Sequence, residues 1–133
     1  MNTLPGIITH IQQSGAILLV DVQVENIQIS ALLIESTYTP DWLYKNSPVF
    51  VVCKETEISI AKNLSGSIST RNRIPCNVTN VERGELLSTI YLTYATYHLQ
   101  AAITTRSVDA LKIQQGDMVE ALIKANEVSI MKQ

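Results

Sequence analysis

The chain contains an internal repeat, and this feature limits its fold more than any other. Residues 54–62 return as residues 124–132, seventy positions later, with five identities in nine. The same offset aligns residues 2–5 with 72–75, and an offset of seventy-one aligns 31–36 with 102–107. A fixed period of this length indicates a duplicated structural unit. We therefore expect two modules, at residues 1–63 and 69–133, joined by a short polar linker at residues 64–68.

Each module has the pattern of a small β-sheet. Apolar residues alternate with polar ones, as at Val20, Val22 and Val24, which is the period of a strand with one face on a core. Isoleucine, valine and threonine supply 39 of the 133 residues, and these β-branched types favour strands. About five short strands are predicted per module, with hairpin turns at residues 24–27 and 94–97 and a helical turn at residues 39–43 and 107–111.

This pattern predicts an all-β chain of two tandem five-stranded OB-like barrels, each with a short helical turn. A domain of about sixty residues buries only about 60% of its unfolded surface, so such a barrel is marginally stable alone. Charged residues make up 17% of the chain, which is below the usual quarter. We therefore expect each module to pack against its sister and against other chains, in a homo-oligomer such as a dimer or a trimer.

Charge and cysteine usage exclude several classes of protein. A net charge of −2 opposes general binding to phosphate backbones. The N-terminus lacks a basic region and the apolar run 16–20 ends at Asp21, so we expect a cytoplasmic protein with neither a membrane nor a nucleic-acid partner. Cys53 and Cys76 have no C-x-x-C spacing and no nearby histidine, which favours buried free thiols over a zinc site or a disulfide.

Two features stand out as candidates for binding. The polar segment at residues 69–72 precedes an apolar strand, and it is either a solvated turn or a source of donors for a ligand. Lys124 lies between Ile123 and Ala125 in a strand-like segment. It is either an outward lysine that discourages edge pairing or a charge for an anion site. Lys54 holds the equivalent place in the first module, and both interpretations remain open.

Several ordered blocks resemble the molybdate-binding Mop, or molbindin, modules of the TOBE type. Residues 69–72 (S-T-R-N), 102–111 (A-I-T-T-R-S-V-D-A-L), 116–117 (G-D) and 121–125 (A-L-I-K-A) are similar to the successive blocks of such a module. Residues 4–11 resemble the start of a Mop module in the sensor region of the bacterial molybdate-responsive regulator. Pro75 and Cys76 replace a glycine-containing step, and Leu33 stands where the second module has Thr104.

The resemblance implies a site for molybdate or tungstate as bound ligand, with no directly ligated metal cation. The implied oxyanion-binding residues are Ser69, Arg71, Asn72, Thr104, Ser107, Lys124 and Ala125, with Ser36 and Lys54 as a possible second class. Hydroxyls, backbone N–H groups and a lysine suit a tetrahedral dianion, because it presents negative charge and several acceptor oxygens. In the family such sites lie between modules, so Ser69 and Arg71 of one chain would meet Ser107 and Lys124 of another.

The resemblance leaves two functions open. The first is storage or buffering of the oxyanion by a binding protein that is not an enzyme. The second is a sensing module that acts on a partner protein. Binding of single-stranded nucleic acid through Tyr91, Tyr94 and Tyr97 is a third reading, but these residues are more simply explained by packing. His10 and His98 have no evident carboxylate or nucleophile beside them, which opposes catalysis.

Overall fold

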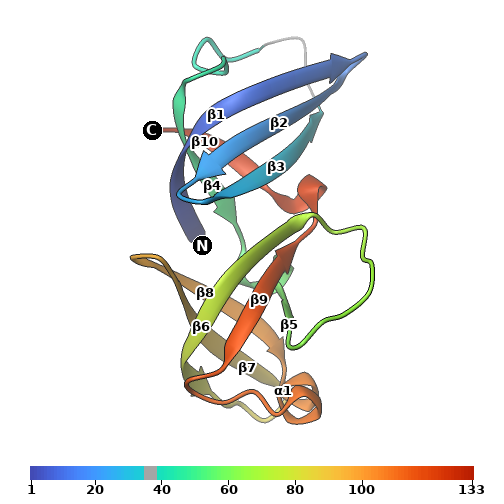
Figure 1. The fold of residues 1–133 in the computed structure, drawn as a ribbon, viewed down its shortest axis with the longest axis vertical. Helices are drawn as coiled ribbons and strands as arrows, with labels where there is room; N and C mark the ends of the chain where they lie inside the picture. The colour runs from blue at the N-terminus through green and yellow to red at the C-terminus, as the bar shows by residue number, and fades with distance from the viewer. Residues whose placement is uncertain (35–38) are drawn as a thin grey trace.

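The computed structural model describes residues 1–34 and 39–133, which form two β-barrels stacked along one long axis (Figure 1). The first half of the chain contains β1 (Asn2–Ser14), β2 (Ile17–Val24), β3 (Ile27–Ile34), β4 (Pro48–Cys53), the 3-10 turn η1 (Glu55–Glu57) and β5 (Ser59–Ala61). The second half contains β6 (Asn72–Glu82), β7 (Leu87–Tyr94), β8 (Tyr97–Thr104), α1 (Thr105–Leu111), β9 (Met118–Ile123), the 3-10 turn η2 (Ala125–Glu127) and β10 (Ser129–Lys132). The predicted fold class, two five-stranded OB-like barrels, is confirmed.

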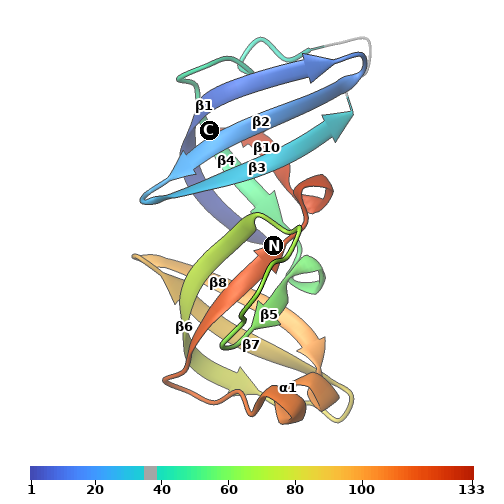
Figure 2. The same ribbon diagram turned by 45° about the vertical axis from the view of Figure 1, so that its right-hand side comes forward.

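The last strand of each half closes the barrel of the other half. The two sheets have the orders β10-β4-β1-β2-β3 and β5-β9-β6-β7-β8. Ser129 of β10 lies opposite Val52 of β4, and Ser59 of β5 lies opposite Leu122 of β9. Figures 1 and 2 show red β10 in the upper barrel and green β5 in the lower one. The barrels therefore differ from the sequence modules 1–63 and 69–133, because each module supplies a strand to its neighbour.

The turns follow the sequence patterns in most places. The hairpins at residues 24–27 and 94–97 are confirmed, with Val24 paired to Ile27 and Tyr94 paired to Tyr97. The first turn residues, Glu25 and Ala95, have φ of 51° and 52°. Positive φ at this position is typical of two-residue hairpin turns that match the twist of the flanking strands.

The helical turn is present in the second half only, as far as the structure describes the chain. Thr104 is the N-cap of α1, and its hydroxyl accepts a hydrogen bond from the Ser107 N–H at 3.1 Å, so Ser107 lies inside the first turn. The helical turn expected at residues 39–43 is not formed as a helix, because isolated hydrogen-bonded turns, such as the one closed by the Leu43 N–H on the Pro40 carbonyl at 3.1 Å, occupy this segment instead. Leu33, the counterpart of Thr104, has no side-chain oxygen with which to cap a helix.

The two cysteines are buried free thiols, as predicted. Burial raises the pKa of the Cys53 thiol to about 11 and that of Cys76 to about 12, so both are protonated at neutral pH. The described residues contain no group of three or more His, Cys, Asp or Glu that could hold a metal ion. None of the helices within residues 1–34 and 39–133 is long and apolar enough to cross a membrane.

Lys62 fixes the exchanged strand β5 to the second barrel. Its Nζ donates to the Lys112 carbonyl and to Asp117 Oδ2, both at 2.9 Å. The same carboxylate oxygen accepts a hydrogen bond from the Gln114 N–H at 2.9 Å. This backbone hydrogen bond, together with Lys62, holds the pKa of Asp117 below its usual value.

This contact predicts that acid weakens the closure of the second barrel. A carboxyl whose pKa is lower in the folded chain stabilises the fold above its unfolded pKa, about 3.9 for aspartate, and this contribution is lost as pH falls through the folded value. Asp117→Asn should therefore lower the urea midpoint at neutral pH and flatten its decline below about pH 4. Circular dichroism at a series of pH values measures both effects, and parallel curves for the two proteins would contradict the assignment.

Candidate functional site

Two buried asparagines join the barrels through a matched pair of contacts. Asn72, at the start of β6, receives the Ser30 N–H on Oδ1 and donates Nδ2 to the Ser30 carbonyl, both at 2.8 Å. Asn2, at the start of β1, does the same with Gln100, at 2.7 and 2.8 Å. Each side chain therefore pairs with the edge of β3 or β8 in the opposite barrel. The same pair of hydrogen bonds thus occurs twice at the junction, once from each module.

Tyrosine hydroxyls complete this junction. The buried Tyr94 hydroxyl donates to the Val24 carbonyl at 3.0 Å and accepts the Asn26 N–H at 3.1 Å. Tyr97 donates to Glu25 Oε1 at 2.9 Å, and this carboxylate raises the pKa of the phenol. Tyr94 and Tyr97 therefore hold the two barrels together, whereas the Tyr91 hydroxyl donates to Glu82 of its own barrel.

The junction contains a cavity of about 580 Å³ beside Asn72 that is open to solvent. Its walls come from the β2–β3 hairpin of the first barrel, from the segment before β6 and from the start of η2. They are formed by Leu19, Asp21, Gln28, Ser30, Leu32, Ser69, Thr70, Arg71, Asn72, Lys124, Ala125 and Asn126. We call this space the Lys124 cavity.

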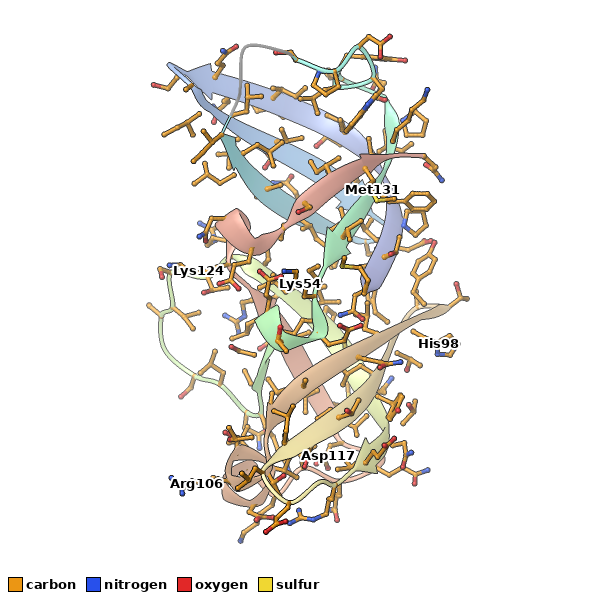
Figure 3. The ribbon with its side chains drawn as sticks, turned by 180° about the vertical axis from the view of Figure 1, so that it is seen from behind. Lys54, His98, Arg106, Asp117, Lys124 and Met131 are labelled. Carbon is orange, nitrogen blue, oxygen red and sulfur yellow. The ribbon has the colours of Figure 1, made fainter. Side chains whose placement is uncertain are left out.

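Five of the residues that the sequence singled out lie around the Lys124 cavity, namely Ser69, Arg71, Asn72, Lys124 and Ala125. Lys124 is placed there because β9 ends at Ile123 and the chain then turns into η2. Figure 3 shows Lys124 at the waist between the barrels. The polar segment 69–72 and the strand-end lysine therefore belong to one concave surface of one chain.

Thr104 and Ser107 lie elsewhere. Their hydroxyls are 2.8 Å apart at the start of α1, and Thr104 lines a different cavity together with Arg106 and Asp109. Figure 3 shows Arg106 at the end of the second barrel that is far from Lys124. A single chain thus does not bring Thr104 and Ser107 to the Lys124 cavity.

The contact of Ser69 and Arg71 of one chain with Ser107 and Lys124 of another stays a prediction. Within one chain, Ser69, Arg71 and Lys124 already line the same cavity. The exchange of β5 and β10 places η2, and with it Lys124, against the first barrel. Of the possible second class, Lys54 is exposed just before η1, and Ser36 lies outside the described residues.

The charges of the Lys124 cavity favour an anion. Within the described part of the chain, neither Lys124 nor Arg71 forms an ion pair, and both side chains are exposed. The opposing charge is Asp21, whose Oδ1 accepts the Ser30 hydroxyl at 2.7 Å. Two free cations therefore face one carboxylate that is already hydrogen-bonded. Such a cavity suits a small anion with several acceptor oxygens.

The wall contributed by the first barrel was not predicted from the sequence. Asp21 and Ser30 are cross-strand partners on β2 and β3, and both stand on the outward face of the hairpin. The alternation pattern identifies outward positions, but it does not show which other surface they face. A polar Asp–Ser pair between outward apolar residues such as Leu19 and Leu32 was the available signal.

Asp21 yields a prediction of tighter binding. Asparagine at this position keeps an acceptor for the Ser30 hydroxyl and removes a negative charge that repels an anion. Asp21→Asn should raise anion affinity about two- to fivefold, since a partly exposed charge interaction amounts to roughly 0.5–1 kcal/mol. Isothermal titration with molybdate at low salt measures the change, and a weaker affinity would show that the carboxylate contributes to binding instead.

Comparison with known proteins agrees with this architecture. The TOBE domain family matches residues 68–130. The cytoplasmic molybdate-binding protein ModG, in a form with molybdate bound, superposes with a TM-score of 0.93 at 20% identity, over 99% of this chain and 96% of that chain. A molybdate-binding protein from Sporomusa ovata superposes with a TM-score of 0.50 at 37% identity, over 50% of this chain and 100% of that chain.

Curated relatives include the molybdenum import ATP-binding proteins ModC of Brucella abortus and Brucella suis, which are 42% identical over 73 residues. This match covers 54% of the chain, which spans about a fifth (20%) of the length of these relatives. The likeness to ModG shows the two-barrel fold of the whole chain. Half of the chain matches the full length of the Sporomusa ovata protein. Residues 68–130 therefore belong to the TOBE family, and the chain as a whole has the architecture of a tandem protein of the Mop type.

Proposed function

We propose that this protein binds molybdate or tungstate without transforming it, and that the Lys124 cavity is the binding site. The observation that carries the proposal is the convergence of Ser69, Arg71, Asn72 and Lys124 on one cavity at the barrel junction. ModG and the Sporomusa ovata protein, which share its fold or its sequence, are molybdate-binding proteins.

The chemistry of the walls fits a tetrahedral dianion. Lys124 supplies a compact charge with three donors, and Arg71 supplies a planar fork that matches two oxygens at once. The Ser69 hydroxyl and backbone N–H groups around Arg71, Asn72 and Ala125 add neutral donors. No cofactor or metal cation is needed for such binding, because these groups satisfy the acceptor oxygens directly.

The size of the cavity indicates that a second chain completes the site. A five-atom oxyanion occupies a few water volumes of about 30 Å³ each. The Lys124 cavity holds about 580 Å³, so one anion leaves most of it open. Leu32 on its wall is 38% exposed, and Ile34 further along β3 is 85% exposed, which favours burial of this strand edge against another chain. In such a homo-oligomer, a dimer or a trimer, Thr104 and Ser107 of one chain contact the anion bound in the Lys124 cavity of another chain.

Storage or buffering in the cytoplasm is the role that this arrangement serves best. An anion held between chains stabilises the assembled form by mass action, so uptake and assembly rise together. The alternative role, sensing on behalf of a partner protein, uses the same site and the same coupling. The structure carries no feature in its described residues that favours the sensing role over storage.

Native mass spectrometry with and without molybdate tests the proposal. We expect an assembly of two or three chains that gains whole numbers of molybdate or tungstate ions, with sulfate as the control anion. A monomer that gains no molybdate at concentrations that saturate other binding proteins would contradict the proposed function. Anion uptake by a monomer would retain the site but remove the role of the second chain.

A further inference from the structure

The junction contains a second cavity that the repeat relates to the first. It holds about 280 Å³ and is lined by Met1, Asn2, Glu55, Thr79, Tyr91, Leu92, His98, Leu99 and Gln100. Six of these residues correspond, seventy positions apart, to residues of the Lys124 cavity. In order, Tyr91, His98, Gln100, Met1, Asn2 and Glu55 are the counterparts of Asp21, Gln28, Ser30, Arg71, Asn72 and Ala125. We call this space the Glu55 cavity.

The backbone frame of the two cavities is the same. Asn2 pairs with Gln100 as Asn72 pairs with Ser30, and η1 follows β4 as η2 follows β9. Their side chains therefore decide whether both can hold an oxyanion. A duplicated protein of this kind offers either two equivalent anion sites or one site and one altered copy.

The charges of the Glu55 cavity have the wrong sign for an anion. Glu55 stands where Ala125 stands in the Lys124 cavity, and no lysine or arginine of residues 1–34 and 39–133 lines the space. Among the described residues that line it, the cationic group is the Met1 ammonium, which contacts the Glu55 carboxylate. This contact lowers the pKa of Glu55, so the carboxylate is ionised at neutral pH. Ammonium and carboxylate together leave no net positive charge for a dianion.

The remaining changes reduce space and donors. Tyr91 replaces Asp21, and its hydroxyl donates to Glu82 Oε2 at 2.9 Å rather than into the cavity. His98 replaces Gln28 with a bulkier ring. The Glu55 cavity has about 280 Å³ where its counterpart has about 580 Å³.

We infer that Glu55 excludes oxyanions from the second junction cavity, so that this duplicated protein keeps only one of two repeat-related anion sites. The inference rests on the proposed function, because it assumes that the Lys124 cavity takes molybdate. It makes Glu55 a residue that sets how many anions each chain holds, with the shape of the cavity set further by His98. The first module then serves the site of the second by contributing the wall that contains Asp21 and Ser30.

Placing residues of the Lys124 cavity at the equivalent positions of the Glu55 cavity tests this inference. Glu55→Ala and the double variant Glu55→Ala/His98→Gln copy Ala125 and Gln28 into the Glu55 cavity. Asp41→Ala is a matched control, because it removes one negative charge at an exposed turn that lines neither cavity. Circular dichroism and elution volume verify that each variant folds and assembles like the wild type.

The readout is the number of molybdate ions per chain at saturation, measured by equilibrium dialysis with elemental analysis. We expect the double variant to gain about one weakly bound anion per chain, Glu55→Ala to gain part of it, and Asp41→Ala to gain none. A wild type that binds molybdate, with both Glu55 variants unchanged, would overturn the inference and leave the proposed function intact. A wild type that binds no molybdate would instead overturn the proposed function.

Discussion

Replacing Lys124 by alanine is expected to weaken molybdate binding by about ten- to hundredfold, because hydrogen bonds to charged groups contribute roughly 1.5–3 kcal/mol. Lys124 lines the cavity at the barrel junction and has no carboxylate partner in the described chain, so its charge is available to the anion. Isothermal titration at fixed ionic strength measures the loss. Because the side chain is exposed, the strand signal in circular dichroism should stay unchanged.

Lys54→Ala is the matched control for this variant. Lys54 occupies the equivalent position before η1, is also exposed, and does not line the Glu55 cavity. Its removal changes net charge by the same amount, so it reports the general effect of lowering positive charge. Equal losses in the two variants would mean that binding responds to overall charge, and that Lys124 has no place in a defined site.

Asn72→Ala is expected to destabilise the protein by about 2–4 kcal/mol, since each buried backbone group left without a partner costs roughly 1–3 kcal/mol. The asparagine is 2% exposed and satisfies both the N–H and the carbonyl of Ser30. Its loss leaves two polar groups unpaired at the junction of the barrels. Urea unfolding followed by circular dichroism measures the change in the free energy of unfolding.

Asn2→Ala separates the stability effect from the binding effect. Asn2 makes the same pair of hydrogen bonds with Gln100 and is 5% exposed, but it does not line the Lys124 cavity. Both variants should lose similar stability, whereas only Asn72→Ala should weaken molybdate binding at temperatures where both remain folded. Loss of binding in Asn2→Ala as well would contradict a specific role of Asn72, because it would show that binding requires the whole barrel junction to be intact.

The repeat and the alternation of apolar residues were sufficient to predict two five-stranded barrels. Both signals are local, and the core positions that they identify are buried in the structure, as at Val20, Val22 and Val24. The exchange of β5 and β10 was not predictable in this way. The two strands share the same Ser-Ile pair and follow the buried Ile58 and Val128, so either barrel satisfies their pattern equally well.

The candidate site was predictable in part for a related reason. Ser69, Arg71 and Lys124 stand out because polar and cationic residues adjoin apolar strands of their own module. Asp21 and Ser30 reach the cavity only through the way in which the barrels stack, and that arrangement depends on the asparagine pairs and on the exchanged strands. Long-range contacts of this kind leave no periodic trace in a single sequence.

Anomalous diffraction at the molybdenum absorption edge, from crystals grown with molybdate, locates the bound anion. We expect a strong peak in the Lys124 cavity, within hydrogen-bond distance of Lys124 Nζ and near Ser69 and Arg71. We expect no peak in the Glu55 cavity of the wild-type protein. Molybdenum located only away from Lys124, or absent from saturated crystals, would contradict the proposed site.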